Sequence, residues 1–251
     1  MPSVDRKWLP PALIAAACVA SVATYGWLPE MMELRFEGLL PFEVRPVPGA
    51  APRWLVLCLM PALALLMWVA FRWARTDAGQ QVAQRMFRHA PAEVTSPGQF
   101  ERFGKTYDTI VLGVVLLLLG LHAAVLAAAL QAPALASRIV PAVLGGCLVL
   151  MGNVMPRLRP NWVAGIRTRR TLEDPQLWRR THRAFGAAFV VSGLATIVAA
   201  VAAPRYGVLV GIASLALSCL IGFVVSTRRN GTASHGGIED GRVGQGGRLG
   251  P

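Results

Sequence analysis

Residues 106–130 read TYDTIVLGVVLLLLGLHAAVLAAAL, a run in which His122 is the only ionisable side chain away from the ends. A water-soluble core does not require an apolar run of this length, whereas crossing about 30 Å of hydrocarbon at about 1.5 Å per residue does. The whole chain is 54% hydrophobic and 15% charged, and a soluble domain would carry about 25% charged residues. The run therefore predicts a membrane-spanning helix, and the composition predicts a membrane protein.

Other apolar runs have the length of a membrane span. The one after Arg6 and Lys7 has the charged start of a signal peptide, but it is longer than the usual apolar region of about 7–15 residues, so we expect it to remain as a helix. The predicted fold class is all-α, a polytopic membrane helical bundle with six transmembrane helices. Besides 106–130, these helices are expected at about 8–28, 53–73, 137–155, 184–203 and 206–226.

The Lys and Arg residues of the connections predict the orientation, because cytoplasmic loops carry an excess of these residues. The N-terminus, the loops at 72–105 and 157–183, and the C-terminal tail together hold 20 of the 25 Lys and Arg residues. The other connections hold five, and the first of them also carries Glu30, Glu33, Glu37 and Glu43. We therefore predict that both termini are cytoplasmic.

The same features divide the chain into three regions. Residues 1–105 are expected to form a two-helix membrane region with an acidic extracytoplasmic loop at 29–52 and a cytoplasmic loop at 72–105. Residues 106–226 are expected to form a four-helix domain with a basic cytoplasmic loop at 157–183. The glycine-rich residues 227–251 have little apolar content and predict a disordered cytoplasmic tail.

The cysteines and histidines are not spaced as in a metal site or a disulfide-bonded protein. The four cysteines lie inside apolar runs and the four histidines are scattered, so we predict no metal site and no cofactor. The formal net charge of +12 would suggest nucleic acid in a soluble protein. Here the topology signal and anionic lipid headgroups at the basic loop explain it instead.

The stretch at 152–186, GNVMPRLRPNWVAGIRTRRTLEDPQLWRRTHRAFG, differs from the rest of the chain. Asp174-Pro175 is a favourable helix start, and we expect that helix to continue unbroken into the fifth span. On it Trp178, Thr181, His182 and Phe185 fall on one face. Beside the arginines, this face could hold an anionic or peptide ligand, or it could dock the helix on its neighbours while the arginines set the topology.

The residue pattern of this stretch resembles the SdpI family of bacterial membrane proteins. The resemblance is carried by GN at 152–153, RPNW at 159–162, GIRT at 165–168, TL at 171–172 and WRRTHR at 178–183. The N-terminal helix pair matches the domain that often accompanies the family only at Leu28-Pro29-Glu30, and Arg170 stands where the family often has Trp.

The resemblance implies a multi-pass protein of the bacterial plasma membrane that is not an enzyme. It implies immunity to a peptide toxin, signal transduction by docking a cytoplasmic transcriptional repressor, or both, with no direct nucleic-acid contact. The candidate residues for binding a ligand or partner are Asn153, Arg159, Asn161, Trp162, Gly165, Arg167, Thr168, Thr171, Trp178, Arg179, Thr181, His182 and Arg183.

Two other functions stay open from the residues themselves. A small transporter or channel would use His122, because ionisable groups within spans often mark a transport path. An intramembrane enzyme acting on a lipid would use His182 as acid and base, with the arginines binding phosphate.

Overall fold

The computed structural model describes residues 8–37, 43–86, 99–161 and 164–227. It contains six helices that are long and apolar enough to cross a membrane, which confirms the prediction of six spans. The third of them begins at Gln99 rather than at Thr106, and the fifth begins at Pro175 and continues unbroken, as predicted. The six are α1 (Leu9–Thr24), α2 (Arg53–Trp73), α5 (Gln99–Ala129), α6 (Pro133–Val154), α8 (Pro175–Ala202) and α9 (Pro204–Thr227).

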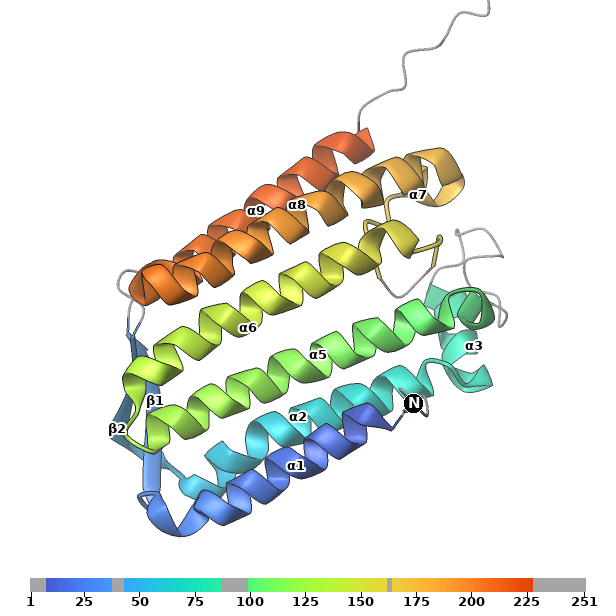
Figure 1. Ribbon diagram of the computed structural model, residues 1–251. Helices are drawn as coiled ribbons and strands as arrows, with labels where there is room; N and C mark the ends of the chain where they lie inside the picture. The colour runs from blue at the N-terminus through green and yellow to red at the C-terminus, as the bar shows by residue number, and fades with distance from the viewer. Residues whose placement is uncertain (1–7, 38–42, 87–98, 162–163, 228–251) are drawn as a thin grey trace, which may run out of the picture.

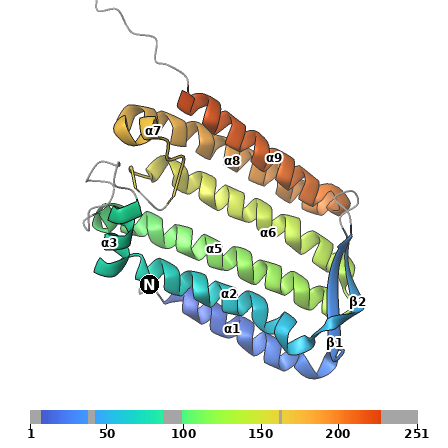
Figure 2. The ribbon, with the colours of Figure 1, turned by 180° about the vertical axis from the view of Figure 1, so that it is seen from behind.

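These helices pack side by side nearly in sequence order (Figures 1 and 2). Both α1 and α2 contact α5, α5 contacts α6, and α6 contacts both α8 and α9. One end of the bundle, which we call the basic end, carries the start of α1, the end of α9 and the short helices α3 (Asp77–Met86) and α7 (Arg169–Glu173). The assignment of this end to the cytoplasm remains a prediction from the charge count.

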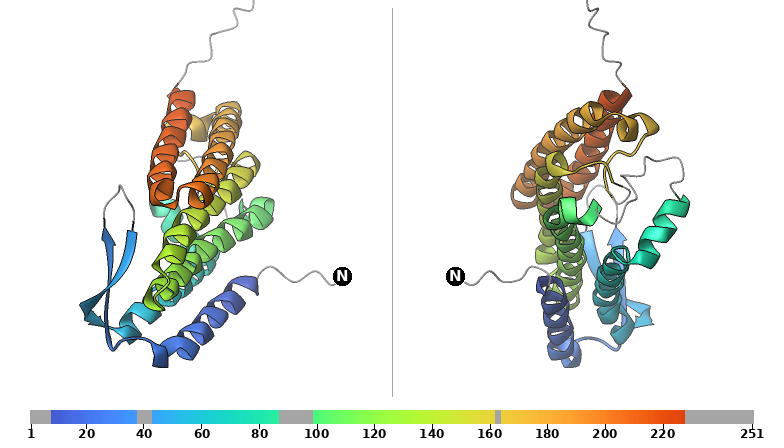
Figure 3. Two further views of the ribbon diagram at one scale, coloured as in Figure 1. Left: turned by 60° about the vertical axis from the view of Figure 1, so that its left-hand side comes forward. Right: turned by 90° about the vertical axis from the view of Figure 1, so that its right-hand side faces the viewer.

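The opposite end, which we call the hairpin end, carries the only strands in the described part of the chain. Strand β1 (Met31–Glu37) pairs antiparallel with β2 (Glu43–Pro52), with a register irregularity between Met32 and Glu33. Together they form a ribbon alongside the ends of the helices (Figure 3). The all-α prediction missed this hairpin because β2 contains prolines and a glycine, residue types that are depleted in strands.

The sequence also left the loop at 72–105 without structure, whereas α3 lies within it. Gly79 sits where an added Cβ would lie 2.5 Å from the carbonyl oxygen of Trp73, and the Gln80 side chain donates to the carbonyl of Ala74. Helix α3 is therefore folded back tightly against the end of α2. The predicted disordered tail falls on residues outside the described ranges, apart from Thr227, which ends α9.

Helices α6 and α8 cross with their backbones in close contact. A Cβ on Gly152 would lie 2.6 Å from the carbonyl oxygen of Gly186, and one on Gly145 would lie 2.7 Å from that of Gly193. Small residues allow such contact between membrane helices, where packing and hydrogen bonds rather than the hydrophobic effect hold helices together. This glycine seam fixes how the start of α8 lies against the end of α6, and so positions the loop between them.

A candidate site in the basic loop

Two helices, α7 and α8, begin in or directly after the loop that follows α6, and side chains cap the start of each. Thr168 and Thr171 form a reciprocal cap at the start of α7: the Thr171 backbone N–H donates to the Thr168 hydroxyl oxygen at 3.2 Å, and the Thr168 N–H donates to the Thr171 hydroxyl oxygen at 3.0 Å. Asp174 caps α8, accepting from the N–H groups of Gln176 and Leu177 at 2.8 and 3.0 Å, which confirms the predicted helix start.

His182 ties this loop to α8. Its side chain is fully buried, and its Nε2 accepts a hydrogen bond from the backbone N–H of Ile166 at 3.1 Å. Because Nε2 is the acceptor, the ring proton of the neutral side chain lies on Nδ1, which donates to the carbonyl of Trp178 at 2.9 Å. The bond at Nε2 holds the loop and the bond at Nδ1 lies within α8, so neither ring nitrogen is available to transfer a proton in this arrangement.

Gly165 is the residue that allows this bond. Its φ of 109° is in the left-handed region, which residues with a Cβ rarely adopt. A Cβ there would also clash with the Nε2 atom of His182. The glycine and the histidine of the GIRT and TH motifs are thus a matched pair, since the ring occupies the space that a side chain at 165 would need.

Asn161 and Trp178 satisfy the backbone of the preceding turn. The Asn161 amide donates to the carbonyl of Arg159 at 2.7 Å, and its oxygen accepts from the N–H of Ala164 at 2.8 Å. The Trp178 ring donates through Nε1 to the carbonyl of Leu158 at 2.8 Å and stacks on the His182 ring, with 3.9 Å between the centroids. Asn161 and Trp178 are both fully buried, so they act inside the loop.

The predicted stripe of α8 therefore faces the protein interior. Trp178, Thr181, His182 and Phe185 are all buried, and the Trp178 and Phe185 rings belong to the core cluster with Leu158. Within the described ranges, the Thr181 hydroxyl has no hydrogen-bond partner. The stripe docks α8 on α6 and the loop, and ligand binding by these residues remains a prediction.

The arginines lie on the outside of the same loop. Arg159, Arg167, Arg179 and Arg183 are exposed, so the buried polar residues hold a scaffold that presents positive charge. Arg169 pairs with Glu173 at 2.9 Å, an interaction that raises the pKa of Arg169. Arg170 donates to the carbonyl of Thr227 at 3.1 Å, where the negative end of the α9 dipole favours a cation.

Two predicted residues stand apart from this scaffold. Asn153 is exposed near the end of α6, and its amide donates to the carbonyl of Val149 in the same helix. Trp162 lies outside the described residues. The structure thus brings together the Gly165, Thr168, Thr171, Trp178 and His182 part of the prediction, and it separates Asn153 from it.

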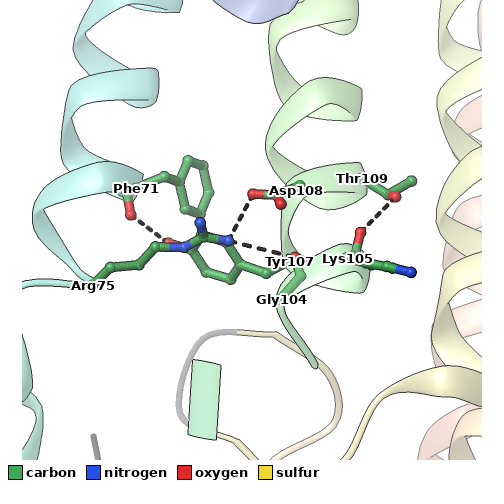
Figure 4. A network of polar contacts seen from close by, with 7 residues as sticks. All are labelled: Phe71, Arg75, Gly104, Lys105, Tyr107, Asp108 and Thr109. Atoms are coloured by element: carbon green, nitrogen blue, oxygen red, sulfur yellow. Dashed lines mark hydrogen bonds and ion pairs between the residues drawn. The ribbon is translucent and has the colours of Figure 1, made fainter. Parts of the chain in front are cut away.

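A second polar cluster at the basic end was missed from the sequence. Arg75 lies across the Tyr107 ring, with 4.4 Å from the guanidinium carbon to the ring centroid, and pairs with Asp108 at 2.7 Å (Figure 4). The Tyr107 hydroxyl donates to the carbonyl of Phe71 at 2.6 Å. These contacts hold the end of α2 against α5. The signal in the sequence is Asp108, an acidic residue at the start of an apolar run.

His122 is the ionisable group inside a span. It is buried in α5, and its Nε2 lies 2.9 Å from the Ser21 hydroxyl of α1. The Ser21 hydroxyl also lies 3.1 Å from the carbonyl of Ala17, and Nδ1 of His122 has no partner in the part of the chain that the structure describes. The pair joins two helices, as a polar contact within a membrane does.

Comparison with known proteins bears on this loop. Residues 157–227 match the SdpI/YfhL protein family, so the match covers the basic loop with α7, α8 and α9. No curated protein matches the chain. No solved structure matches it either.

Proposed function

We propose that this chain, whose residues 157–227 belong to the SdpI/YfhL protein family, is a multi-pass protein of the bacterial plasma membrane that acts without catalysis. In this proposal it confers immunity to a peptide toxin, transmits a signal by docking a cytoplasmic regulator, or does both. The basic loop is the docking surface, and the regulator is of the transcriptional-repressor type that the family resemblance implies.

The observation that carries the proposal is that buried and exposed residues of the matched segment have different roles. The buried residues Asn161, Thr171, Trp178 and His182 bond to the loop's own backbone, and these bonds hold the loop in one shape. The arginines of the loop remain on its outer surface. A rigid surface of exposed guanidinium groups suits an acidic protein face, because arginine binds carboxylates through paired hydrogen bonds.

The alternative functions gain less support. An enzyme with His182 as acid and base would need a ring nitrogen facing a substrate, whereas both nitrogens are bonded to backbone groups. A transport path through His122 would need further polar residues along its length. In the part of α5 around His122 the neighbouring residues are apolar, and the polar group beside its ring is the Ser21 hydroxyl of α1.

The test compares two matched pairs of arginines. Arg179→Gln with Arg183→Gln removes two charges from the basic loop, and Arg138→Gln with Arg205→Gln removes two from the hairpin end. We expect the first pair to lower capture of a cytosolic regulator by the detergent-solubilised protein about fivefold, from roughly 0.5 kcal/mol per exposed contact. The second pair should capture as the parent does.

A functional readout accompanies the capture. A strain lacking this protein is challenged with peptide toxins and complemented with each variant. Loss of protection with the basic-loop pair alone supports the proposal. Equal behaviour of the two pairs in both assays, or capture and protection unchanged by either, contradicts docking at the basic loop.

A further inference from the structure

Ile166 is the point at which the basic loop is fastened to the helices around it. Its N–H donates to Nε2 of His182 at 3.1 Å, and its carbonyl accepts from the Thr171 hydroxyl of α7 at 2.7 Å. Its side chain packs on the core cluster that contains Phe185, at a place where Gly222 of α9 leaves room for it. Release of Ile166 would therefore loosen the loop from α8 and α9 together.

The bond between Ile166 and His182 exists only while the imidazole is neutral. A neutral ring carries one proton, and here that proton lies on Nδ1, which leaves Nε2 as the acceptor. A second proton on Nε2 would set two donors against each other, the ring N–H and the backbone N–H of Ile166. The closed loop therefore excludes the charged form of the ring.

The ring itself has no room to avoid this conflict. It is fully buried, and an added Cβ on Gly165 would clash with Nε2, so the loop backbone lies directly against this atom. Rotation of the ring would break the bond from Nδ1 to the carbonyl of Trp178 and the stacking on the Trp178 ring. A proton on Nε2 must therefore displace the loop rather than the ring.

The charged ring is tolerated once the loop has moved. Its Nδ1–H keeps the carbonyl of Trp178 and its face keeps the Trp178 ring, because both groups belong to α8 itself. An aromatic face also attracts a cation. The N–H groups of Nε2 and Ile166 then both reach water at the basic end, so protonation favours the open loop.

The charged side chains on the elements around His182 are all exposed, apart from the half-buried Asp174 that caps α8. They are Arg157 after α6, Arg159 and Arg167 of the loop, Arg169, Arg170 and Glu173 of α7, and Asp174, Arg179, Arg180 and Arg183 at the start of α8. The described ends of α6 and α9 that pack here carry no charged side chain. Histidine is the side-chain type that ordinarily changes its charge between about pH 5 and 8, so among these described residues His182 is the one that responds in that range.

We propose that the His182–Ile166 pair is a pH-sensitive switch, in which a neutral imidazole holds the basic loop closed on α8 and protonation of Nε2 releases it. The switch changes the arrangement of the exposed arginines without changing their charge. It concerns the shape of the loop alone and does not depend on the proposed function.

The test measures hydrogen–deuterium exchange of the amides at 164–168 in the full chain, in detergent, at about pH 7.5 and 5.5. The rates are corrected for the intrinsic dependence of exchange on pH. Imidazole in water titrates near pH 6.5, so the population of the open loop should rise about tenfold between the two conditions. Amides of α8 beyond Phe185 should show no such rise.

Two matched substitutions assign the effect. His182→Gln supplies an amide oxygen that can accept from Ile166 but does not titrate, so its loop should exchange equally at both pH values. His122→Gln removes the buried histidine of α5 and should behave as the parent does. Circular dichroism checks that each variant is folded.

The parent protein can overturn the proposal without any variant. Corrected exchange at 164–168 that is the same at the two pH values would show that protonation does not open the loop. A pH-dependent rise that persists in folded His182→Gln, or that disappears in folded His122→Gln, would assign the response to another group and would equally contradict the switch.

Discussion

The two faces of α6 are packed in opposite ways. On one face, Gly145 and Gly152 bring its backbone against Gly193 and Gly186 of α8, with room for no side chain. On the other face, Gly146 opens into a groove of about 500 Å³ toward α1 and α5. Adjacent glycines in one helix thus have different consequences, because a helix turns about 100° per residue.

The same contrast separates the two halves of the bundle. The C-terminal half is held by backbone contact and by buried polar side chains that bond to the loop at 158–168. The N-terminal half is held by apolar clusters, such as Ile14, Ala64 and Val115, by the polar pair Ser21–His122 within the spans, and by the Arg75 cluster at the basic end. Close contact leaves no tolerance for a larger residue, whereas side-chain packing can adjust.

The largest expected effect tests the tight half at its tightest point. Gly165→Ala should destabilise the protein by about 3 kcal/mol or more, since it adds a left-handed backbone strain of about 1–3 kcal/mol to a steric clash with His182. Thermal unfolding in detergent, followed by tryptophan fluorescence, measures the loss. The double variant Gly165→Ala with His182→Ala keeps the backbone strain but removes the clash. Gly165→Ala should therefore cost less stability in the His182→Ala background than in the parent protein. An unchanged melting temperature in Gly165→Ala would contradict the matched-pair interpretation.

An intermediate effect compares the two faces of α6 directly. Gly152→Ala places a Cβ 2.6 Å from the Gly186 carbonyl oxygen and should cost about 1–3 kcal/mol. Gly146→Ala meets nothing and should be neutral or stabilise the helix by about 0.5–1 kcal/mol. Both substitutions are read by thermal unfolding in the same detergent. Equal losses for the two would mean that the glycines serve helix flexibility rather than close contact.

The smallest effect tests the loose half. Ser21→Ala removes the hydrogen-bond partner of His122, and hydrogen bonds between membrane helices contribute about 0.6 kcal/mol on average. A double-mutant cycle with His122→Ala isolates the coupling between the two side chains. A coupling of about 3 kcal/mol would show that this half, too, depends on a specific polar contact, and the comparison would then fail.

Much of the fold could be predicted because the bilayer constrains it locally. The spans at 53–73 and 206–226 agree closely with α2 and α9, since a fixed hydrocarbon thickness requires a fixed length of apolar helix. The Asp174 cap was predictable for the same kind of reason, because it depends on two neighbouring residues. The hairpin at 31–52 could not be predicted, because the prolines and the glycine of its second strand disfavour a strand.

The sequence by itself determined that this is a six-span membrane protein, because span length and charge distribution are properties of short segments. It also marked the segment at 152–186 as unlike the rest. The tertiary structure decided what those marked residues do. His182 and Trp178 face inward to bond the loop, the arginines face outward, and Gly165 makes room for an imidazole that is distant in sequence. Such roles depend on which backbone atoms the fold brings within hydrogen-bond distance, and that proximity exists only after the helices have packed.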